Sequence, residues 1–178
     1  MKDVANTART PIGLSLSKAM LGTIVLLAAC APVERAPLTG QADFVRVDKS
    51  DRTLTLFRDG RVLREYTGFA LGDAPEGHKQ FEGDERTPEG RYTIDTRNPA
   101  SAYHLSLRVS YPNDTDRAFA ETQGRSPGGD IFIHGQPNAS PIERLPGDWT
   151  DGCIAVSDAE MDELWGAIAD GTPIEIVP

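Results

Sequence analysis

Residues 131–156 of the 178-residue chain read IFIHGQPNASPIERLPGDWTDGCIAV. The first three are apolar residues typical of β-strands, and they place His134 at the end of the strand, directly before Gly135. Cys153 follows 19 residues after His134 and comes directly after Gly152. Because glycine adopts backbone angles that other residues avoid, we expect a strand that ends at His134 and a sharp turn just before Cys153.

His134 and Cys153 suit nucleophilic acyl transfer. A thiol nucleophile requires a base for its proton, hydrogen-bond donors for the developing oxyanion, and a turn that exposes the sulfur. His134 is the candidate base because imidazole titrates near neutral pH, and the backbone amides of Gly152 and Cys153 are candidate donors. Taken alone, the same residues also fit a buried structural histidine and a cysteine that packs as a small apolar side chain.

The sequence around this stretch predicts a fold that is mainly β. Polar and apolar residues alternate over 53–57, a second strand-like run follows over 61–66, and Asp59-Gly60 between them favours a hairpin turn. Further short strands are predicted at residues 43–47, 91–94, 103–109, 131–134 and 173–177. Residues 111–130 are polar and glycine-rich, with one or two helical turns at 117–122, so we expect a surface excursion that is a candidate lid over the site.

One helix is predicted near the C-terminus. Ser157 and Glu160 match a capping box, in which each side chain bonds a free backbone N–H of the other. The apolar stripe that follows at helical spacing consists of Met161, Leu164, Trp165 and Ile168. Gly171 and Pro173 then end the helix. The fold class expected from these patterns is mainly β with one or two short helices.

The first residues of the chain are typical of an export signal. Basic residues precede an apolar run over 19–29, which is shorter than the roughly 20 residues of a membrane-spanning helix. The run ends in LAAC at Cys30, which resembles a bacterial lipobox. We therefore expect a signal peptide over 1–29, lipidation of Cys30, a flexible tether over 30–42 and a folded domain over 43–178.

Composition excludes several classes of function. The formal net charge is −9 and no basic patch is apparent, so a nucleic-acid partner is not expected. A mean hydropathy of −0.36 excludes a polytopic membrane protein. The three histidines are scattered and there is no Cys-x-x-Cys pair, so we expect neither a metal site nor a cofactor.

The site residues also resemble a known signature. His134-Gly135 followed by TDGC over residues 150–153 is similar to the signature of the L,D-transpeptidase (YkuD-type) catalytic domain family. TPEGRY over residues 87–92 is similar to that family's turn before a core strand. The resemblance extends over residues 43–177, and it implies an L,D-transpeptidase-like β-sandwich.

The resemblance implies an enzyme of the bacterial cell wall. Cys153 would attack the carbonyl of the third residue of a peptidoglycan stem and expel the terminal D-alanine. The thioester would then pass to an acceptor amine or to water. His134 would be the general base and later the acid, and the amides of Gly152 and Cys153 would form the oxyanion hole. Weaker candidates for substrate contact are Gly135, Thr150, Asp151, Tyr103, His104 and Trp149.

The chain departs from the family pattern at two positions. Many members have His where Asp151 stands, and Arg or Asn where Ala155 stands. A carboxylate two residues from the sulfur tends to raise the pKa of the thiol. The C-terminal segment is similar to a branch that includes an amidase releasing an outer-membrane lipoprotein from peptidoglycan. A hydrolase, namely an L,D-carboxypeptidase or such an amidase, and an inactive peptidoglycan-binding module therefore remain alternatives to the transferase.

The expected partners follow from these interpretations. They are peptidoglycan stem peptides, a peptidoglycan-linked lipoprotein in the amidase alternative, and a membrane reached through lipidated Cys30. Ala31 after the lipidated position leans, by lipoprotein analogy, towards the outer membrane of a Gram-negative cell. The expected location is the periplasmic face of the cell envelope.

Overall fold

The computed structural model describes residues 36–178. The predicted signal peptide over 1–29, Cys30 and the first residues of the predicted tether lie outside this range. Among the described residues, none of the helices combines the length and the apolar character that a membrane crossing requires.

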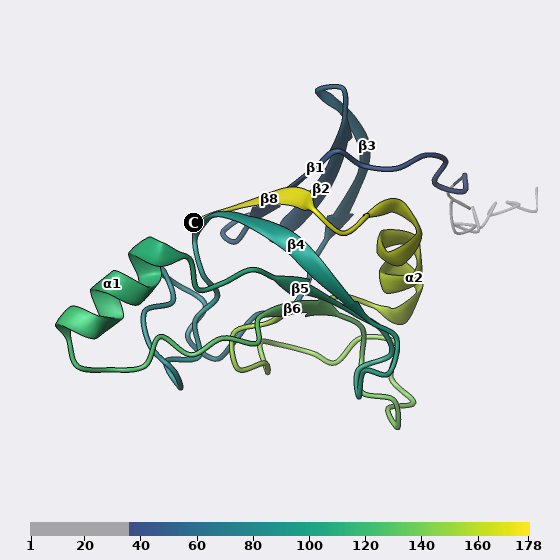
Figure 1. Cartoon of the computed structure of the whole chain (residues 1–178). Helices are drawn as coiled ribbons and strands as arrows, with labels where there is room; N and C mark the ends of the chain where they lie inside the picture. The colour runs from purple at the N-terminus through teal and green to yellow at the C-terminus, as the bar shows by residue number, and fades with distance from the viewer. Residues whose placement is uncertain (1–35) are drawn as a thin grey trace, which may run out of the picture. The chain divides into compact units, whose positions relative to one another are not determined.

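The described chain forms one eight-stranded sheet and two helices (Figure 1). The strands are β1 (Phe44–Asp48), β2 (Thr53–Arg58), β3 (Arg61–Thr67), β4 (Gly90–Asn98), β5 (Ser106–Val109), β6 (Phe132–His134), β7 (Ile154–Ala155) and β8 (Thr172–Val177). The helices are α1 (Asp114–Thr122) and α2 (Asp158–Ala167). The strand order is β3-β2-β1-β8-β4-β5-β6-β7, in which only the pairs β1–β8 and β6–β7 are parallel. Figure 1 shows the sheet curled, and the prediction of a mainly β fold with one or two short helices is confirmed.

The predicted hairpin is the pair β2–β3. Asp59 and Gly60 join the strands with φ angles of 50° and 70°. Positive φ at both central residues is the geometry of the tight turns that match the twist of a hairpin, and Asp-Gly tolerates it. Leu54 and Leu56 of β2 point into the core and are fully buried. Burial follows the sequence pattern only in part, because Thr55 between the two leucines is also buried and the apolar Val62 of β3 is 61% exposed.

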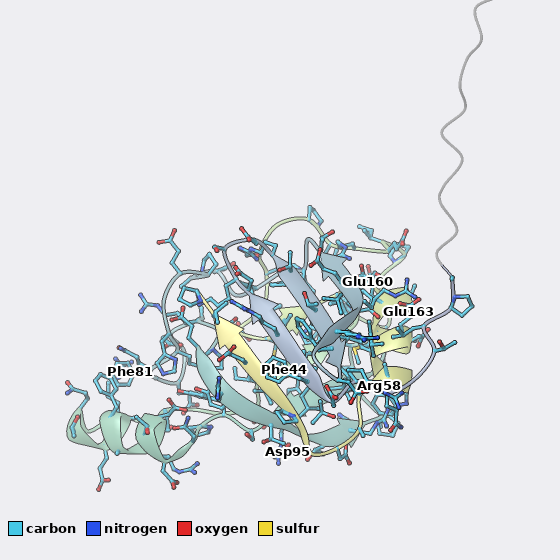
Figure 2. The ribbon with its side chains drawn as sticks, turned by 90° about the horizontal axis from the view of Figure 1, so that it is seen from above. Phe44, Arg58, Phe81, Asp95, Glu160 and Glu163 are labelled. Carbon is cyan, nitrogen blue, oxygen red and sulfur yellow. The ribbon has the colours of Figure 1, made fainter. Side chains whose placement is uncertain are left out.

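The predicted C-terminal helix is α2. Ser157 is its N-cap, and the reciprocal bonds of the capping box with Glu160 are both present. Met161 and Leu164 are fully buried against the core, as the apolar stripe predicts. On its outer side, Glu163 accepts a hydrogen bond of 2.9 Å from the hydroxyl of Tyr66 in β3, and Figure 2 shows this helix beside the hairpin. The helix thus closes the core at one end of the sheet.

The strand predicted over 103–109 begins three residues late. β5 starts at Ser106, and the residues before it form bends. His104 has a φ of 61°, and its backbone N–H donates to Asn138 Oδ1 at 2.7 Å instead of to a neighbouring strand. The alternating pattern predicted too long a strand, because the His104 N–H bonds a loop residue 34 positions further along the chain and not a neighbouring strand.

The excursion over 111–130 contains α1, which is longer than the predicted one or two turns. Asp116 anchors it to the body, because its carboxylate accepts from the hydroxyl of Tyr92 at 3.0 Å and lies 3.1 Å from His78 Nε2. Phe119 of α1 packs against Phe81, which Figure 2 shows beside the helix. Figure 1 shows α1 projecting from the body. The helix itself is therefore not folded over the sheet.

Candidate active site

A cavity of about 620 Å³ lies at the β5–β6–β7 end of the sheet. Residues of both sequence motifs line it together with loop residues from three other segments. The lining consists of Lys79, Glu82, Gly83, Glu85, Asn98, Ser101, Ala102, Tyr103, Ser106, Gly128, Gly129, Asp130, Phe132, His134, Trp149, Thr150, Asp151 and Cys153. The fold therefore brings the predicted base and the predicted nucleophile to the same cavity.

His134 is held in one orientation at the end of β6. Its Nδ1 lies 2.7 Å from the carbonyl oxygen of Gly135. Because a carbonyl only accepts hydrogen bonds, Nδ1 carries the proton and Nε2 keeps a free lone pair. Burial lowers the pKa of His134, and the bond to Gly135 opposes that shift. The ring is therefore neutral near pH 7 and able to accept a proton at Nε2.

Two aromatic rings enclose the imidazole. The ring of Tyr103 lies 4.7 Å from that of His134, centre to centre, and the ring of Trp149 lies 5.7 Å from it in an edge-on arrangement. The two outer rings are themselves 6.0 Å apart. Tyr103 is 40% exposed. Aromatic packing of this kind restricts ring rotation, and Tyr103 still presents surface to an incoming ligand.

Cys153 lies just before β7, opposite β6. Its sulfur accepts a hydrogen bond of 3.4 Å from the backbone N–H of Phe132. Burial raises the pKa of the thiol to about 11; the Phe132 N–H and Lys79 oppose this, while Asp151 and Asp130 add to it. The resting protein therefore holds a neutral thiol, which donates to the Asp130 carbonyl at 3.5 Å, and a neutral imidazole in the same cavity, so that attack requires transfer of the thiol proton to a base.

The turn before Cys153 depends on Gly152. Gly152 has a φ of 113°, and a Cβ at this position would lie 2.4 Å from the carbonyl oxygen of Arg86. The Thr150 hydroxyl accepts from the Gly152 N–H at 3.2 Å and donates to the Cys153 carbonyl at 2.8 Å. Within residues 36–178, the N–H of Cys153 is left without a hydrogen-bond acceptor. Of the two predicted oxyanion donors, Cys153 N–H is thus the one available to a ligand.

A second set of contacts fixes the segment upstream of the turn. Asp148 forms two bonds of 2.6 Å with the guanidinium of Arg52 and accepts from the N–H of Leu71 at 2.8 Å. The N–H groups of Trp149 and Thr150 both donate to the Leu71 carbonyl at 3.0 Å. These contacts span up to 96 residues of sequence and hold Trp149 against His134.

The weaker sequence candidates divide into two groups. Tyr103, Trp149, Thr150 and Asp151 line the cavity. Gly135 and His104 do not line it: a Cβ at Gly135 would lie 2.5 Å from Asp158 Oδ1, and His104 Nε2 lies 2.7 Å from Asp162 Oδ1 of α2. Gly135 therefore permits close packing, whereas His104 faces the helix.

Ala155 does not line the cavity either. It is fully buried in β7, where it pairs with His134 and exchanges two backbone hydrogen bonds of 2.9 Å with Ala70. A small side chain at this position fits that close approach.

The cavity carries excess negative charge. Its acidic lining consists of Glu82, Glu85, Asp130 and Asp151, and none of these four forms a salt bridge with a residue of the described range. Lys79, the one basic side chain of the lining, is buried and paired with Asp84 at 2.9 Å. In the part of the chain that the structure describes, no three His, Cys, Asp or Glu side chains are grouped so that they could hold a metal ion.

Several site contacts were not predicted from the sequence. They are the Phe132 amide on the sulfur, the Asp148–Arg52 pair and the hydroxyl of Thr87, which donates to the Gly152 carbonyl at 2.9 Å. TPEGRY over 87–92 was the one signal that pointed to Thr87, and it indicated a turn before a strand without a partner for the side chain.

Comparison with known proteins agrees with the family resemblance seen in the sequence. A family model described as the L,D-transpeptidase catalytic domain (YkuD) matches residues 42–176. The protein named "Putative L,D-transpeptidase YafK" of Escherichia coli (strain K12) is 26% identical over 151 residues, which cover 76% of this chain and 52% of YafK. The chain therefore spans about half the length of this curated relative.

Solved structures show the same similarity. The helical cell shape determining protein Pgp2 of Campylobacter jejuni is 29% identical with a TM-score of 0.61, covering 77% of this chain and 48% of Pgp2. Bd1075 of Bdellovibrio bacteriovorus is 28% identical with a TM-score of 0.54, covering 78% and 48%. The L,D-transpeptidase of Xylanimonas cellulosilytica (residues 123–326 of that protein) shares the fold, with 19% identity, a TM-score of 0.52 and coverage of 79% and 63%. The family match covers most of the chain, which therefore belongs to the L,D-transpeptidase (YkuD) catalytic domain family.

Proposed function

We propose that the protein is a cysteine acyltransferase that acts on peptidoglycan stem peptides. The observation that carries this proposal is the presence, in one cavity, of the half-buried Cys153 thiol and of an imidazole whose Nδ1 is bonded to the Gly135 carbonyl. That bond leaves Nε2 of His134 as a proton acceptor for Cys153. Membership of the L,D-transpeptidase family supports peptidoglycan as the substrate class.

In the first half of the proposed reaction, the proton of the Cys153 thiol moves to His134 Nε2 as the sulfur bonds to the carbonyl carbon of the third stem residue. The carbonyl electron pair moves to oxygen, where the Cys153 N–H is free to donate a hydrogen bond. Collapse of this intermediate breaks the C–N bond to the terminal D-alanine, whose amine takes the proton from His134. The product is a thioester on Cys153.

In the second half, the neutral form of an acceptor amine attacks the thioester and gives a proton to His134, and the C–S bond breaks as the sulfur takes that proton from His134 to restore the thiol. The acidic lining of the cavity supports an amine as the acceptor, because Asp130 and Asp151 are exposed carboxylates without an ion-pair partner among the described residues. An amine is protonated and cationic near pH 7, so these carboxylates would attract it. Water as the acceptor would give a carboxypeptidase or amidase instead.

The proposal is tested by incubating the chain with tetrapeptide muropeptides and with lipoprotein-linked sacculi, followed by mass spectrometry of the products. We expect crosslinked dimers or exchange of the terminal D-residue, and no product with Cys153→Ala. Trimmed stems or released lipoprotein would show that the protein is a hydrolase and not a transferase. Full product formation by Cys153→Ala, or binding to sacculi without any reaction, would overturn an enzymatic role for this site.

We also propose that the protein is anchored to a membrane of the cell envelope through a lipid on Cys30, facing the periplasm. The lipobox-like LAAC sequence at residues 27–30 supports this proposal. Mass spectrometry of the protein purified from membranes is expected to detect a diacylglyceryl group on Cys30, and Cys30→Ser is expected to remain uncleaved or unlipidated. A mature protein that lacks any lipid mass would contradict it.

A further inference from the structure

The peptide group between Gly152 and Cys153 is hydrogen-bonded at its carbonyl oxygen. Its carbonyl oxygen accepts a hydrogen bond of 2.9 Å from the hydroxyl of Thr87, which is 0% exposed. A carbonyl cannot donate, so the threonine hydroxyl is the donor. In a trans peptide the C=O and N–H point in opposite directions, and this bond is trans. The Cys153 N–H is therefore directed away from Thr87, on the side opposite the buried hydroxyl.

The neighbouring peptide groups are held by a different residue. Thr150 accepts from the Gly152 N–H and donates to the Cys153 carbonyl, so it fixes the peptides before and after the one in question. Among the described residues, Thr87 alone contacts the carbonyl of the middle peptide. Glycine at position 152 leaves that peptide free to rotate unless something holds it, because φ and ψ are least restricted at glycine.

Thr87 is itself firmly placed. The ammonium of Lys49 lies 3.5 Å from the Thr87 carbonyl, and it also bonds the Gly77 carbonyl and the Glu89 carboxylate, both at 2.7 Å. Lys49 and Thr87 are both buried. The hydroxyl therefore comes from a rigid support, and Thr87 does not line the cavity.

We propose that Thr87 is a positioning residue for acyl transfer: its hydroxyl fixes the Gly152–Cys153 peptide so that the Cys153 N–H donates to the oxyanion. This inference rests on the proposed attack of Cys153 on a carbonyl. In that step the S–C bond forms, the carbonyl electron pair moves to oxygen, and the thiol proton moves to His134. Thr87 does not contact the substrate, so its effect is carried entirely by the orientation of one N–H group.

The test uses two probes of Cys153 in the full chain. Acylation by p-nitrophenyl acetate passes through an oxyanion, whereas alkylation by iodoacetamide displaces iodide and forms no oxyanion. A change in the ratio of the two rates therefore reports on the oxyanion site, while a general loss of structure slows both reactions. Cys153→Ala provides the background for each probe.

Three variants distinguish a positioning role of the Thr87 hydroxyl from an effect on the stability of the fold. Thr87→Val removes the hydroxyl at nearly constant shape, and Thr87→Ser retains it. Thr172→Val is the matched control, because the Thr172 hydroxyl is also buried and donates to a backbone carbonyl, that of Ala169, at 2.7 Å, but outside the cavity. Thermal unfolding of all three variants establishes that each is folded at the assay temperature.

We expect Thr87→Val to slow acylation by at least about 10-fold, with alkylation changed by less than about two-fold, since loss of an oxyanion donor costs about 10²–10³-fold in rate. Thr87→Ser and Thr172→Val should keep the wild-type ratio of the acylation rate to the alkylation rate. The inference is overturned if Thr87→Val slows both reactions equally or neither, or if Thr172→Val has the same effect. It is also overturned if p-nitrophenyl acetate acylates the wild type no faster than Cys153→Ala.

The two proposals can fail separately. Because p-nitrophenyl acetate contains no stem peptide, the predicted change in ratio can be observed even if muropeptides are not turned over, and then only the proposed substrate is wrong. Conversely, if the chain crosslinks muropeptides but Thr87→Val has no effect on the ratio of rates, the proposed function stands and the positioning role of Thr87 is wrong.

Discussion

The sheet end that contains the β2–β3 hairpin and the sheet end that carries the cavity hold their backbone in different ways. β2 and β3 have 6 and 7 residues and pair from end to end, with one bulge that leaves Leu63 without a partner. β6 and β7 have 3 and 2 residues and pair at two positions. Around Cys153, side chains supplement this short ladder: Thr87 and Thr150 bond the peptide groups next to Cys153, and Asp148 bonds the Leu71 N–H.

Because the two sheet ends hold their backbone differently, single substitutions should have different effects at each. A long antiparallel ladder shares its stabilisation among many backbone hydrogen bonds, so the loss of one side chain there leaves the strands in place. At the cavity end, one hydroxyl or one carboxylate fixes the backbone that carries the nucleophile. Single substitutions at the cavity end should therefore lower activity far more than substitutions elsewhere in the sheet.

The largest contrast is expected between two glycines. Gly152→Ala places a Cβ 2.4 Å from the Arg86 carbonyl oxygen, so the turn must move. A displacement of about 1 Å costs roughly 10²-fold in rate, and we expect at least that loss of product formation. Gly60→Ala in the hairpin has open space around it and only the strain of its positive φ. It should cost about 1 kcal/mol of unfolding free energy and no activity. If the two variants were equally active, the expected difference between the hairpin end and the cavity end would be wrong.

Two ion pairs give the next contrast. Asp148→Asn breaks a partly buried pair that also holds the Leu71 N–H, and we expect a loss of about 1.5–3 kcal/mol in unfolding free energy together with lower activity. Glu175→Gln removes the partner of Arg91, which is 83% exposed, and should change stability by less than about 0.5 kcal/mol. Urea unfolding at neutral pH measures both. Similar losses in the two variants would contradict the account.

The Asp148 pair also predicts a dependence on pH. Burial would raise the pKa of Asp148, but Arg52 and the Leu71 N–H outweigh it and lower that pKa. A lowered pKa in the folded state stabilises the protein above the unfolded value of about 3.9, and this stabilisation is lost as pH falls through the folded value. The stability difference between wild type and Asp148→Asn should therefore shrink in acid. A difference that stays constant down to about pH 2 would exclude this origin.

The sequence predicted the two ends of the sheet unequally. The hairpin and α2 were predicted because their signals are local: an Asp-Gly turn between alternating runs and a capping box before an apolar stripe. His134 and Cys153 were predicted as site residues from residue type and family resemblance, and both line the cavity.

The side chains that hold the site were not predicted. Thr87 and Gly152 are 65 residues apart, and Arg52 and Asp148 are 96 apart. Neither pair leaves a periodic or composition signal in one sequence, since such contacts exist only once the sheet has formed. β7 was missed for the same reason, because two residues carry no alternation and their pairing depends on β6.

The smallest predicted effect concerns the charge near the thiol. Burial is the main cause of the raised pKa of Cys153, and the carboxylate of Asp151 adds to it. Asp151→Asn should therefore lower that pKa and speed alkylation by iodoacetamide at about pH 8, by roughly two- to three-fold. Asp59→Asn at the hairpin turn makes the same change of charge far from the sulfur and should leave the rate unchanged. An equal increase in both variants would point to overall charge as the cause.

The proposed function requires a covalent bond between the sulfur of Cys153 and a carbonyl carbon of a peptidoglycan stem. This bond is detected by measuring the mass of the intact protein after brief mixing with a tetrapeptide muropeptide, followed by mapping of the modified peptide. We expect an added mass equal to the stem without its terminal D-alanine, on Cys153, removable by hydroxylamine and absent in Cys153→Ala. A stem that is turned over by the wild type while Cys153 stays unmodified, or an adduct that persists in Cys153→Ala, would contradict it.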